Sequence, residues 1–479
     1  MGNSLLYHRE RRRMYQEDTI AAIATAMTPS GIGIVRMSGP KAIETAEKVF
    51  RLPGGKQKTD FASHTIHYGH ILDGDTVIDE VMLLVMKAPR SYTTEDTVEI
   101  DCHGGPQVMR RILQVLLKSG ARAAEPGEFT KRAFLNGRID LSSAEAVSDL
   151  IYAENDFAQE NAISQLRGSV YRKITGMRET ILEETAYIEA ALDDPEHYSL
   201  EGYACKLEMV VQELIRRTER MISSYRNGSL LKEGIRVVIV GKPNAGKSSW
   251  MNLLSGQEKA IVTEIAGTTR DTIEEKVRLG TLTLRIMDTA GIRETQDRIE
   301  QIGVERARQN MTQADLILYV VDASLPLDEN DRQICLQIAK KPALILLNKS
   351  DLACAVTETE IKNLLLQTGA AENAHRVLKV SALLETGLSE IEQEITDLFF
   401  DGVVSFNNEV TITNERQVAA LQETRQSLQL AEEGIRAGMS EEFLSIDLMN
   451  AYEALGKVIG ESVGEDLINE IFGKFCMGK

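Results

Sequence analysis

The stretch Gly241–Ser248, which reads Gly-Lys-Pro-Asn-Ala-Gly-Lys-Ser, constrains the fold of this chain more than any other feature. The mostly apolar run Ile235–Val240 before it predicts a buried strand, and Trp250–Leu254 after it predicts a helix. A glycine-rich turn in this position cradles phosphates, because backbone N–H groups and the positive end of the helix dipole face the anion. Lys247 would then reach the β- and γ-phosphates, and Ser248 would ligate magnesium.

Four further motifs follow in the order expected for a guanine-nucleotide module, and each lies in a loop or at the end of an apolar run. A carboxylate such as Asp351 accepts hydrogen bonds from both guanine N1–H and the 2-amino group, and adenine lacks that amino group. The motifs therefore predict a GTPase module. The predicted nucleotide-binding residues are Asn244, Ala245, Gly246, Lys247, Ser248, Ser249, Thr263, Glu264, Ile265, Ala266, Gly267, Thr268, Thr269, Asp288, Thr289, Ala290, Gly291, Asn348, Lys349, Ser350, Asp351, Ser381, Ala382 and Leu383.

The hydrolytic residue is not the usual one. Small GTPases orient the attacking water with a glutamine directly after Asp-x-x-Gly, and here that position is Ile292. Hydrolysis is therefore expected to be slow, or to use a nearby residue of the charged stretch Arg293–Glu300. Asn244 adds a second possibility, since an amide oxygen near the β–γ bridge can help to coordinate a monovalent cation.

Composition excludes some classes of protein. The net charge of −18 argues against a generally basic nucleic-acid binder, although a local basic patch remains compatible with RNA. The five cysteines show no metal or pairing spacing, so reduced thiols in the cytoplasm are the simplest interpretation. No apolar run approaches the length of a membrane span. Residues 1–17 are interpreted as a tail, or as leader residues ahead of a start at Met14.

The 479 residues predict several domains in an α/β multidomain protein. Residues 18–138 mix strand-like and helical runs and predict an α/β domain with a mixed or mostly antiparallel sheet. Residues 139–233 and 402–479 carry helical periodicity, with Ser142 expected to open the first helix and Asp194-Pro195 to break the run. The GTPase module, residues 234–401, is therefore predicted to be inserted into one helical domain formed from both segments.

Three segments outside the GTPase module resemble one family. They are the Gly-Ile-Gly-Ile-Val-Arg-Met-Ser-Gly stretch of residues 31–39, the segment Glu99–Gly105, and the Pro-Gly-Glu-Phe-Thr stretch that continues to Arg138. Together with the final Cys-Met-Gly-Lys, they resemble the tRNA uridine-modification GTPases called MnmE or TrmE. The resemblance covers nearly everything from Asp18 to Lys479.

The resemblance implies a role in adding an aminomethyl or carboxymethylaminomethyl group to carbon 5 of the wobble uridine, position 34. A 5-formyl- or methylene-tetrahydrofolate would supply the carbon to the N-terminal domain, which is also expected to form a homodimer. Arg36, Glu99, Arg138 and Lys479 match the folate-binding positions, although many members of the family have lysine in place of Arg138. Cys476 matches the functional thiol of the family.

The resemblance also implies a GTPase that needs Mg²⁺, held by Ser248 and Thr269, and that K⁺ activates. The potassium positions are Asn244, Thr263, Ile265 and Thr268, and Glu300 is expected to position the attacking water. Members of the family form a heterotetramer with the flavoprotein MnmG (GidA), which brings FAD and NADH, and act on tRNA with ammonium or glycine as amine donor. The competing interpretation is a regulatory or ribosome-assembly GTPase without direct RNA-modifying chemistry.

Overall fold

The computed structural model describes residues 18–57, 59–256, 275–287, 311–339, 341–369, 375–400, 411–461, 463–476 and 478. The chain divides into two compact units. The first comprises Met1–Tyr152, Ala162–Glu219 and Ala419–Lys479, and the second comprises Ala153–Asn161 and Arg220–Val418.

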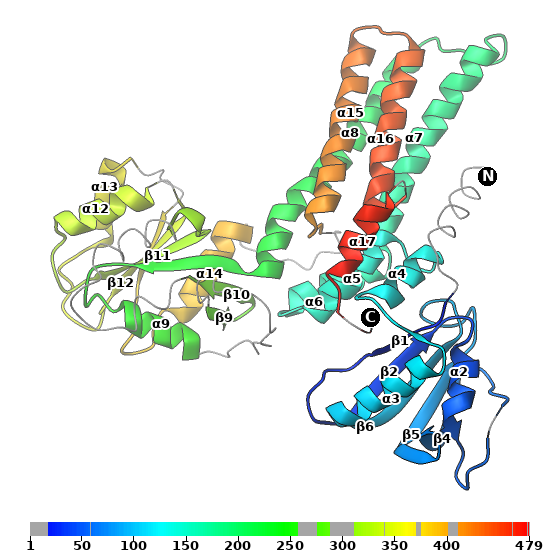
Figure 1. Cartoon of the computed structure of the whole chain (residues 1–479). Coiled ribbons are helices and arrows are strands. Elements are labelled where there is room, and N and C mark those ends of the chain that lie inside the picture. Colours follow the sequence, from blue (N-terminus) through cyan, green and yellow to red (C-terminus); the bar gives the residue numbers. More distant parts are fainter. Residues whose placement is uncertain are drawn as a thin grey trace. The chain divides into compact units, whose positions relative to one another are not determined.

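The first unit combines a sheet with long helices (Figure 1). Its strands are β1 (Ile20–Ile23), β2 (Ser30–Ser38), β3 (Phe50–Arg51), β4 (Thr65–Asp73), β5 (Thr76–Met86), β6 (Thr97–Gly104) and β7 (Arg122–Ala123). Its helices are α2 (Ala42–Val49), α3 (Pro106–Lys118), α4 (Glu128–Leu135), α5 (Leu141–Ile151), α7 (Ser169–Asp193), α16 (Glu441–Ile459) and α17 (Glu465–Gly473). Three helices lie partly in each unit: α6 (Asp156–Leu166), α8 (Tyr203–Glu233) and α15 (Glu415–Arg436).

The seven strands form a mixed sheet in the order β3-β4-β5-β6-β2-β1-β7, in which only β1 and β7 pair in parallel. Strand residues alternate between the two faces. One face packs against α2 and α3, with Val35, Leu83 and Ile100 among its buried core residues. The opposite face carries Arg36 and Glu99. The predicted mixed α/β domain is therefore confirmed.

The long helices of the first unit come from both sides of the GTPase module. Helices α7 and α16 pack along each other, and α8 is tied to α15 by the ion pair between Glu208 and Arg436. Lys457 of α16 pairs with Glu423 of α15. The two helical segments therefore form one helical domain, as the insertion hypothesis predicted. At the start of the first segment, Asp140 rather than Ser142 caps the helix, since its carboxylate accepts the N–H groups of Ser142 and Ser143.

The second unit is built on a six-stranded sheet. Its elements are β8 (Ile235–Val240), α9 (Lys247–Gly256), β9 (Glu275–Leu279), β10 (Leu282–Ile286), β11 (Leu316–Asp322), α12 (Glu329–Ile338), β12 (Ala343–Asn348), α13 (Glu358–Gln367), β13 (His375–Lys379) and α14 (Leu388–Phe400). The strand order is β13-β12-β11-β8-β10-β9, and β9 alone runs antiparallel to its neighbour.

Helices cover both faces of this second sheet, which explains why its central strands β8, β11 and β12 are mostly apolar. Trp250 of α9 and Ile391 of α14 pack on one face, and Cys335 of α12 and Ile361 of α13 pack on the other. This doubly wound α/β arrangement is the fold of the GTPase module that the motifs predicted. Within the described ranges, no helix combines the length and apolar character needed to cross a membrane.

Candidate functional site

The phosphate loop joins the end of β8 to the start of α9, at the carboxyl edge of the parallel sheet. Gly241 has φ 151° and Gly246 has φ 104°, and both conformations favour glycine. At Gly241 an added Cβ would lie 2.3 Å from the carbonyl oxygen of Val320. Asn244, at φ 63°, is left-handed and exposed. The glycines of the motif are therefore required by the loop geometry and by close packing.

Lys247 lies inside this loop. Its Nζ donates to the carbonyl oxygens of Gly241 at 2.8 Å and Lys242 at 2.7 Å. Burial lowers the pKa of Lys247 below its ordinary value. Ser248 and Ser249 follow in the exposed first turn of α9. The loop thus presents one cationic group and a helix N-terminus on the same edge, which suits an anionic ligand.

Asn348 connects the phosphate loop to the two predicted base-binding motifs. Its Nδ2 donates to the Ala245 carbonyl at 2.8 Å, and its Oδ1 accepts from Trp250 Nε1 at 3.1 Å and from the Ala382 N–H at 3.0 Å. Asn348 is 2% exposed, so these bonds replace those it would make to water. Three motifs far apart in the sequence are therefore held together by one amide side chain.

The remaining base-motif residues lie at the same edge. Asp351 Oδ1 accepts from Ser381 Oγ at 2.5 Å, while Lys349 Nζ pairs with Asp322 Oδ2 at 2.5 Å. Asp351 is exposed, and Leu383 is 80% exposed. Ser350 donates its N–H to the carbonyl of Val380. The carboxylate expected to read guanine is thus oriented by a serine of the neighbouring motif.

Several predicted residues lie outside the described residues: the Thr263–Thr269 segment, the Asp288–Gly291 segment, Glu300 and Lys479. Strand β9 begins shortly after the first of these segments, and the second directly follows Met287 at the end of β10. Among the described residues, no three His, Cys, Asp or Glu side chains form a metal-binding group.

Lys242, which the motif analysis did not single out, anchors the phosphate loop. Its Nζ pairs with Asp331 Oδ2 at 2.7 Å and with Asp328 Oδ2 at 3.0 Å. Asp331 is fully buried, and its other oxygen accepts from Tyr319 Oη. These ion pairs raise the pKa of Lys242 in spite of its partial burial. The loop is thereby fixed to the start of α12.

A second group of predicted residues meets in the first unit. Arg36 Nε pairs with Glu99 Oε1 at 2.6 Å, and Arg36 Nη1 donates to the carbonyl of Gly478 at 3.0 Å. Arg138 Nη1 donates to the carbonyl of Tyr92 at 3.0 Å, and its guanidinium lies 5.0 Å from the Tyr92 ring centre. The sheet and the C-terminal tail therefore come together around Arg36.

Two residues that were not predicted as site residues belong to this region: Tyr92, and Asp101 of the matching segment Glu99–Gly105. Burial raises the pKa of Tyr92, and the nearby charges of Arg138 and Arg36 oppose that shift. Asp101 shares the open face of β6 with Glu99. Its Oδ1 is buried without a hydrogen-bond partner among the described residues, and burial followed by the charge of Glu99 raises its pKa. An orphaned carboxylate oxygen beside an arginine–glutamate pair suits a ligand that donates N–H groups.

The C-terminal tail is held against α4 and the sheet. The Gly127 N–H donates to the carbonyl of Cys476 at 3.3 Å, and an added Cβ at Gly127 would lie 2.5 Å from the carbonyl oxygen of Phe472. Cys476 Sγ lies 2.7 Å from Tyr152 Oη, and this hydrogen bond raises the pKa of the phenol. Cys476 is half-buried, so its thiol occupies a defined position in the first unit.

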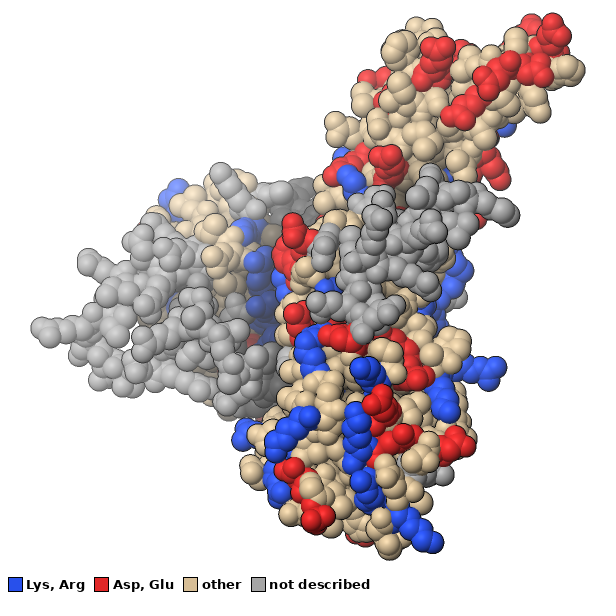
Figure 2. All heavy atoms as spheres, turned by 45° about the vertical axis from the view of Figure 1, so that its right-hand side comes forward, with Lys and Arg blue, Asp and Glu red and all other residues tan. Residues whose placement is uncertain are grey.

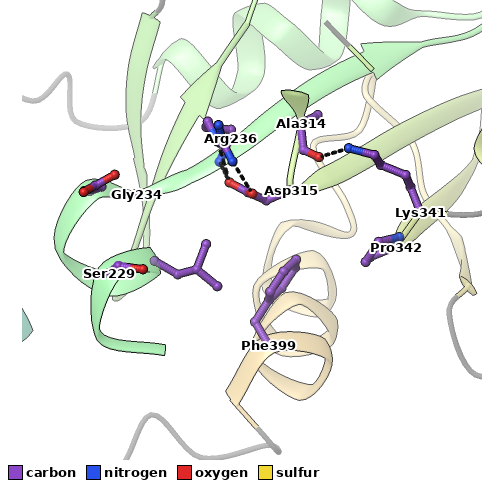
Figure 3. Close-up of a pocket in the computed structure, with 10 residues that line it drawn as sticks. Ser229, Gly234, Arg236, Ala314, Asp315, Lys341, Pro342 and Phe399 are labelled. Atoms are coloured by element: carbon purple, nitrogen blue, oxygen red, sulfur yellow. Dashed lines mark hydrogen bonds and ion pairs between the residues drawn. The ribbon is translucent and has the colours of Figure 1, made fainter. Parts of the chain in front are cut away.

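A cavity of about 450 Å³ lies at the opposite edge of the second sheet (Figure 3). Its walls include Arg236, which pairs with Asp315, and Lys341, which donates to the Ala314 carbonyl. Phe399 contributes the apolar side. This edge holds the amino ends of β8, β11 and β12, whereas nucleotides bind at the carboxyl ends of such sheets. The cavity is therefore separate from the nucleotide site.

Two family models match the chain. The model described as "GTP-binding protein TrmE N-terminus" matches residues 19–138, and "MnmE helical domain" matches residues 141–476. Proteins named "tRNA modification GTPase MnmE" are similar over nearly their whole length. The one from Lachnoclostridium phytofermentans is 54% identical over 463 residues, 96% of this chain and 99% of the relative. Those from Geobacillus kaustophilus and Bacillus subtilis are 46% and 44% identical, over 97% and 96% of this chain and 100% of each relative.

Proposed function

The chain belongs to the MnmE family of tRNA modification GTPases, and from this premise we propose that it couples GTP hydrolysis to C5 modification of the wobble uridine of tRNA. The observation that carries the nucleotide half is the Asn348 side chain, which joins the phosphate loop to the base motifs. The role in tRNA modification is supported by the contacts of Arg36 with Glu99 and with the C-terminal tail.

In the nucleotide site, Lys247 binds the β- and γ-phosphates and the exposed Ser248 hydroxyl holds Mg²⁺ together with Thr269. Magnesium neutralises charge on the phosphates when bound. Glu300 orients the attacking water in place of the glutamine that Ile292 replaces. Asp351 accepts the guanine N1–H and 2-amino groups, and Ser381 Oγ donates to its Oδ1 and so orients the carboxylate.

A monovalent cation is proposed beside the phosphates, held by Asn244 with Thr263, Ile265 and Thr268. Asn244 is exposed and left-handed in the loop, so its amide oxygen is available at the edge where phosphate charge develops. Potassium there would offset charge as an arginine finger does.

The unaltered protein is expected to hydrolyse GTP at least about tenfold faster in potassium than in sodium chloride at equal ionic strength. Asn244→Ala is expected to remove most of that difference, because the cation loses a ligand. Phosphate release measured in both salts tests this. Equal rates for the unaltered protein in the two salts would refute the cation site.

A reduced folate is proposed to bind against the open face of the N-terminal sheet, with Arg36, Glu99, Arg138 and Lys479 as its contacts. The unpartnered Asp101 oxygen fits a pteridine, whose ring and amino groups donate N–H bonds. The folate would supply the one-carbon unit, and Cys476 is the thiol proposed to take part in the transfer.

Arg36→Ala is expected to weaken binding of 5-formyl-tetrahydrofolate by about ten- to a hundredfold, since a hydrogen bond to a charged group contributes about 1.5–3 kcal/mol. Arg111→Ala is the control, because it removes an arginine from α3, on the opposite side of the sheet. It should leave the Kd for the folate unchanged. Isothermal titration calorimetry with the full chain measures the Kd of both variants. No folate binding by the unaltered protein would remove this half of the proposal.

The same open face is proposed as a homodimer interface. Ile66, Tyr68 and Met82 are 63%, 52% and 44% exposed there, and Tyr68 lies directly opposite Met82 across the strand pair. Exposed apolar side chains grouped on one sheet face favour covering by a second copy. The opposite face needs no such cover, because α2 and α3 pack on it (Figure 1).

Met82→Asp is therefore expected to convert the dimer to a monomer, because it buries an unpaired charge at the interface. Leu336→Asp, a residue 48% exposed on α12, is the matched control and should leave the dimer intact. Sedimentation velocity distinguishes the two states. A dimer that survives Met82→Asp would place the interface elsewhere.

The further partners proposed are tRNA and an MnmG-type flavoprotein, which would bring FAD and NADH and complete a heterotetramer. Figure 2 shows lysine and arginine side chains on the N-terminal part of the first unit, interspersed with acidic ones. Lysine and arginine side chains of this kind suit individual phosphate contacts despite the net charge of −18. A cytoplasmic location is proposed from the five free thiols.

A further inference from the structure

The segment Glu154–Phe157, at the start of α6, packs on a hairpin of the GTPase sheet. It precedes the phosphate loop in the chain and lies outside the module that the motifs delimit. It is nevertheless grouped with the second unit, in which Asn155 contacts Thr283 across 128 positions of sequence. Helix α6 continues to Leu166, and its residues from Ala162 onward are grouped with the first unit.

Asn155 is the centre of this contact. Its Nδ2 donates to Thr283 Oγ1 of β10 at 3.2 Å, and its Oδ1 accepts the N–H of Ala158 at 2.8 Å. Asn155 is 7% exposed and Thr283 is 6% exposed, so water does not replace these bonds. One amide therefore caps the first turn of α6 and fastens that turn to the strand.

Neighbouring side chains strengthen the attachment. Glu154 Oε1 pairs with Lys276 Nζ of β9 at 2.5 Å, and Asp156 pairs with Arg278 of the same strand at 3.3 Å. Phe157 packs against the apolar core formed by β8, β9, β10 and the helices beside them. The segment thus holds both strands of the hairpin through polar and apolar contacts.

The hairpin joins the two segments on which GTP hydrolysis depends. Thr269 precedes β9 and Asp288 follows β10 in the sequence. Glu275 and Ile286 pair directly, so the start of β9 and the end of β10 are neighbours. Because β10 runs parallel to β8, this end of the hairpin lies at the same edge of the sheet as the phosphate loop.

We infer that Asn155 and Glu154 are positioning residues for GTP hydrolysis: they fix the β9–β10 hairpin, which is continuous in sequence with Thr269 on one side and Asp288 on the other. The phosphate loop and the base motifs are attached to β8 and β12, whereas Glu154 and Asn155 contact Lys276 of β9 and Thr283 of β10. The two residues therefore affect the hydrolytic step more than nucleotide binding.

The experiment uses the full chain and the steady-state kinetics of GTP hydrolysis. Asn155→Ala removes the bond to Thr283, and Glu154→Lys sets two lysines against each other. Each is expected to lower kcat about tenfold, as small displacements of reacting groups do. The KM for GTP and the affinity for GDP should change less than about twofold. The exchanged pair Glu154→Lys with Lys276→Glu should restore kcat.

A matched control loosens the same hairpin elsewhere. Glu392 of α14 accepts the N–H of Thr281 at the hairpin turn, at the end away from Glu275 and Ile286. Glu392→Ala should therefore leave kcat within about twofold. The inference is overturned if kcat is unchanged in both single variants, if KM rises in parallel with the fall in kcat, if the exchanged pair restores nothing, or if Glu392→Ala is equally harmful.

These outcomes separate the inference from the proposed function. An unaltered chain that does not hydrolyse GTP would contradict the function itself. An unaltered chain that hydrolyses GTP, with variants that do so equally well, would contradict only the role of Glu154 and Asn155. Thermal melting of each variant checks that the fold is retained, and the partly exposed Glu154–Lys276 pair provides a test that does not disturb the core.

Discussion

Asp351→Asn is expected to raise the KM for GTP at least about a hundredfold and to make xanthosine triphosphate the better substrate. In the proposed site the Asp351 carboxylate would accept hydrogen bonds from the guanine N1–H and 2-amino groups. An asparagine would place its own NH₂ donor against the 2-amino donor, and no hydrogen bond would form between them. Xanthine carries an oxygen in place of that amino group, so the asparagine would donate to it instead. Steady-state hydrolysis of both nucleotides measures the exchange.

The local geometry makes this substitution informative. Ser381 Oγ donates to Asp351 Oδ1, and an asparagine with its Oδ1 in the same place would keep that bond. Asp397→Asn on α14 removes the same charge from an exposed site and should leave both KM values unchanged. If Asp351→Asn hydrolysed GTP with an unaltered KM, guanine would be recognised by other residues.

Cys476→Ser is expected to reduce wobble-uridine modification at least about a hundredfold while GTP hydrolysis continues at its normal rate. The thiolate is the reactive form of cysteine, and a serine hydroxyl stays protonated at neutral pH. The thiol lies in the first unit beside Tyr152, whereas the nucleotide residues lie in the second. Nucleoside analysis of the tRNA and phosphate release measure the two activities in one reaction.

Cys205→Ser is the control, because Cys205 is an exposed cysteine on α8 and is not among the proposed site residues. It should support full modification. The prediction would be contradicted if Cys476→Ser lost GTP hydrolysis but still modified tRNA. That result would mean that the first unit does not carry the modification chemistry.

The elements of the fold could be predicted where local pattern determines structure. The strand Ile235–Val240 has the predicted bounds, because a mostly apolar run that ends at the first glycine of the phosphate loop is a local signal. The helix start was predicted at Ser142, two residues after the observed cap Asp140. Asp140, Ser142 and Ser143 are all suitable capping residues, so the local sequence does not distinguish them.

The sites could be predicted only as lists of residues. The motifs gave Asn348 and Asp351, but the bond from Asn348 to the Ala245 carbonyl depends on strand order, which no local window encodes. Tyr92 and Tyr152 carry no motif and reach Arg138 and Cys476 only through folding. The packing of Asn155 against Thr283 was missed for the same reason, because long-range pairing brings the two residues together.

The most direct test of the central claim is a reconstitution with unmodified tRNA, an MnmG-type flavoprotein, a reduced folate and either GTP or a non-hydrolysable GTP analogue. The tRNA is digested and its wobble nucleoside is identified by mass spectrometry. C5-modified uridine is predicted with GTP and not with the analogue. Unmodified uridine alongside normal GTP hydrolysis, or equal modification with ATP in place of GTP, would contradict the coupling of the nucleotide module to tRNA modification.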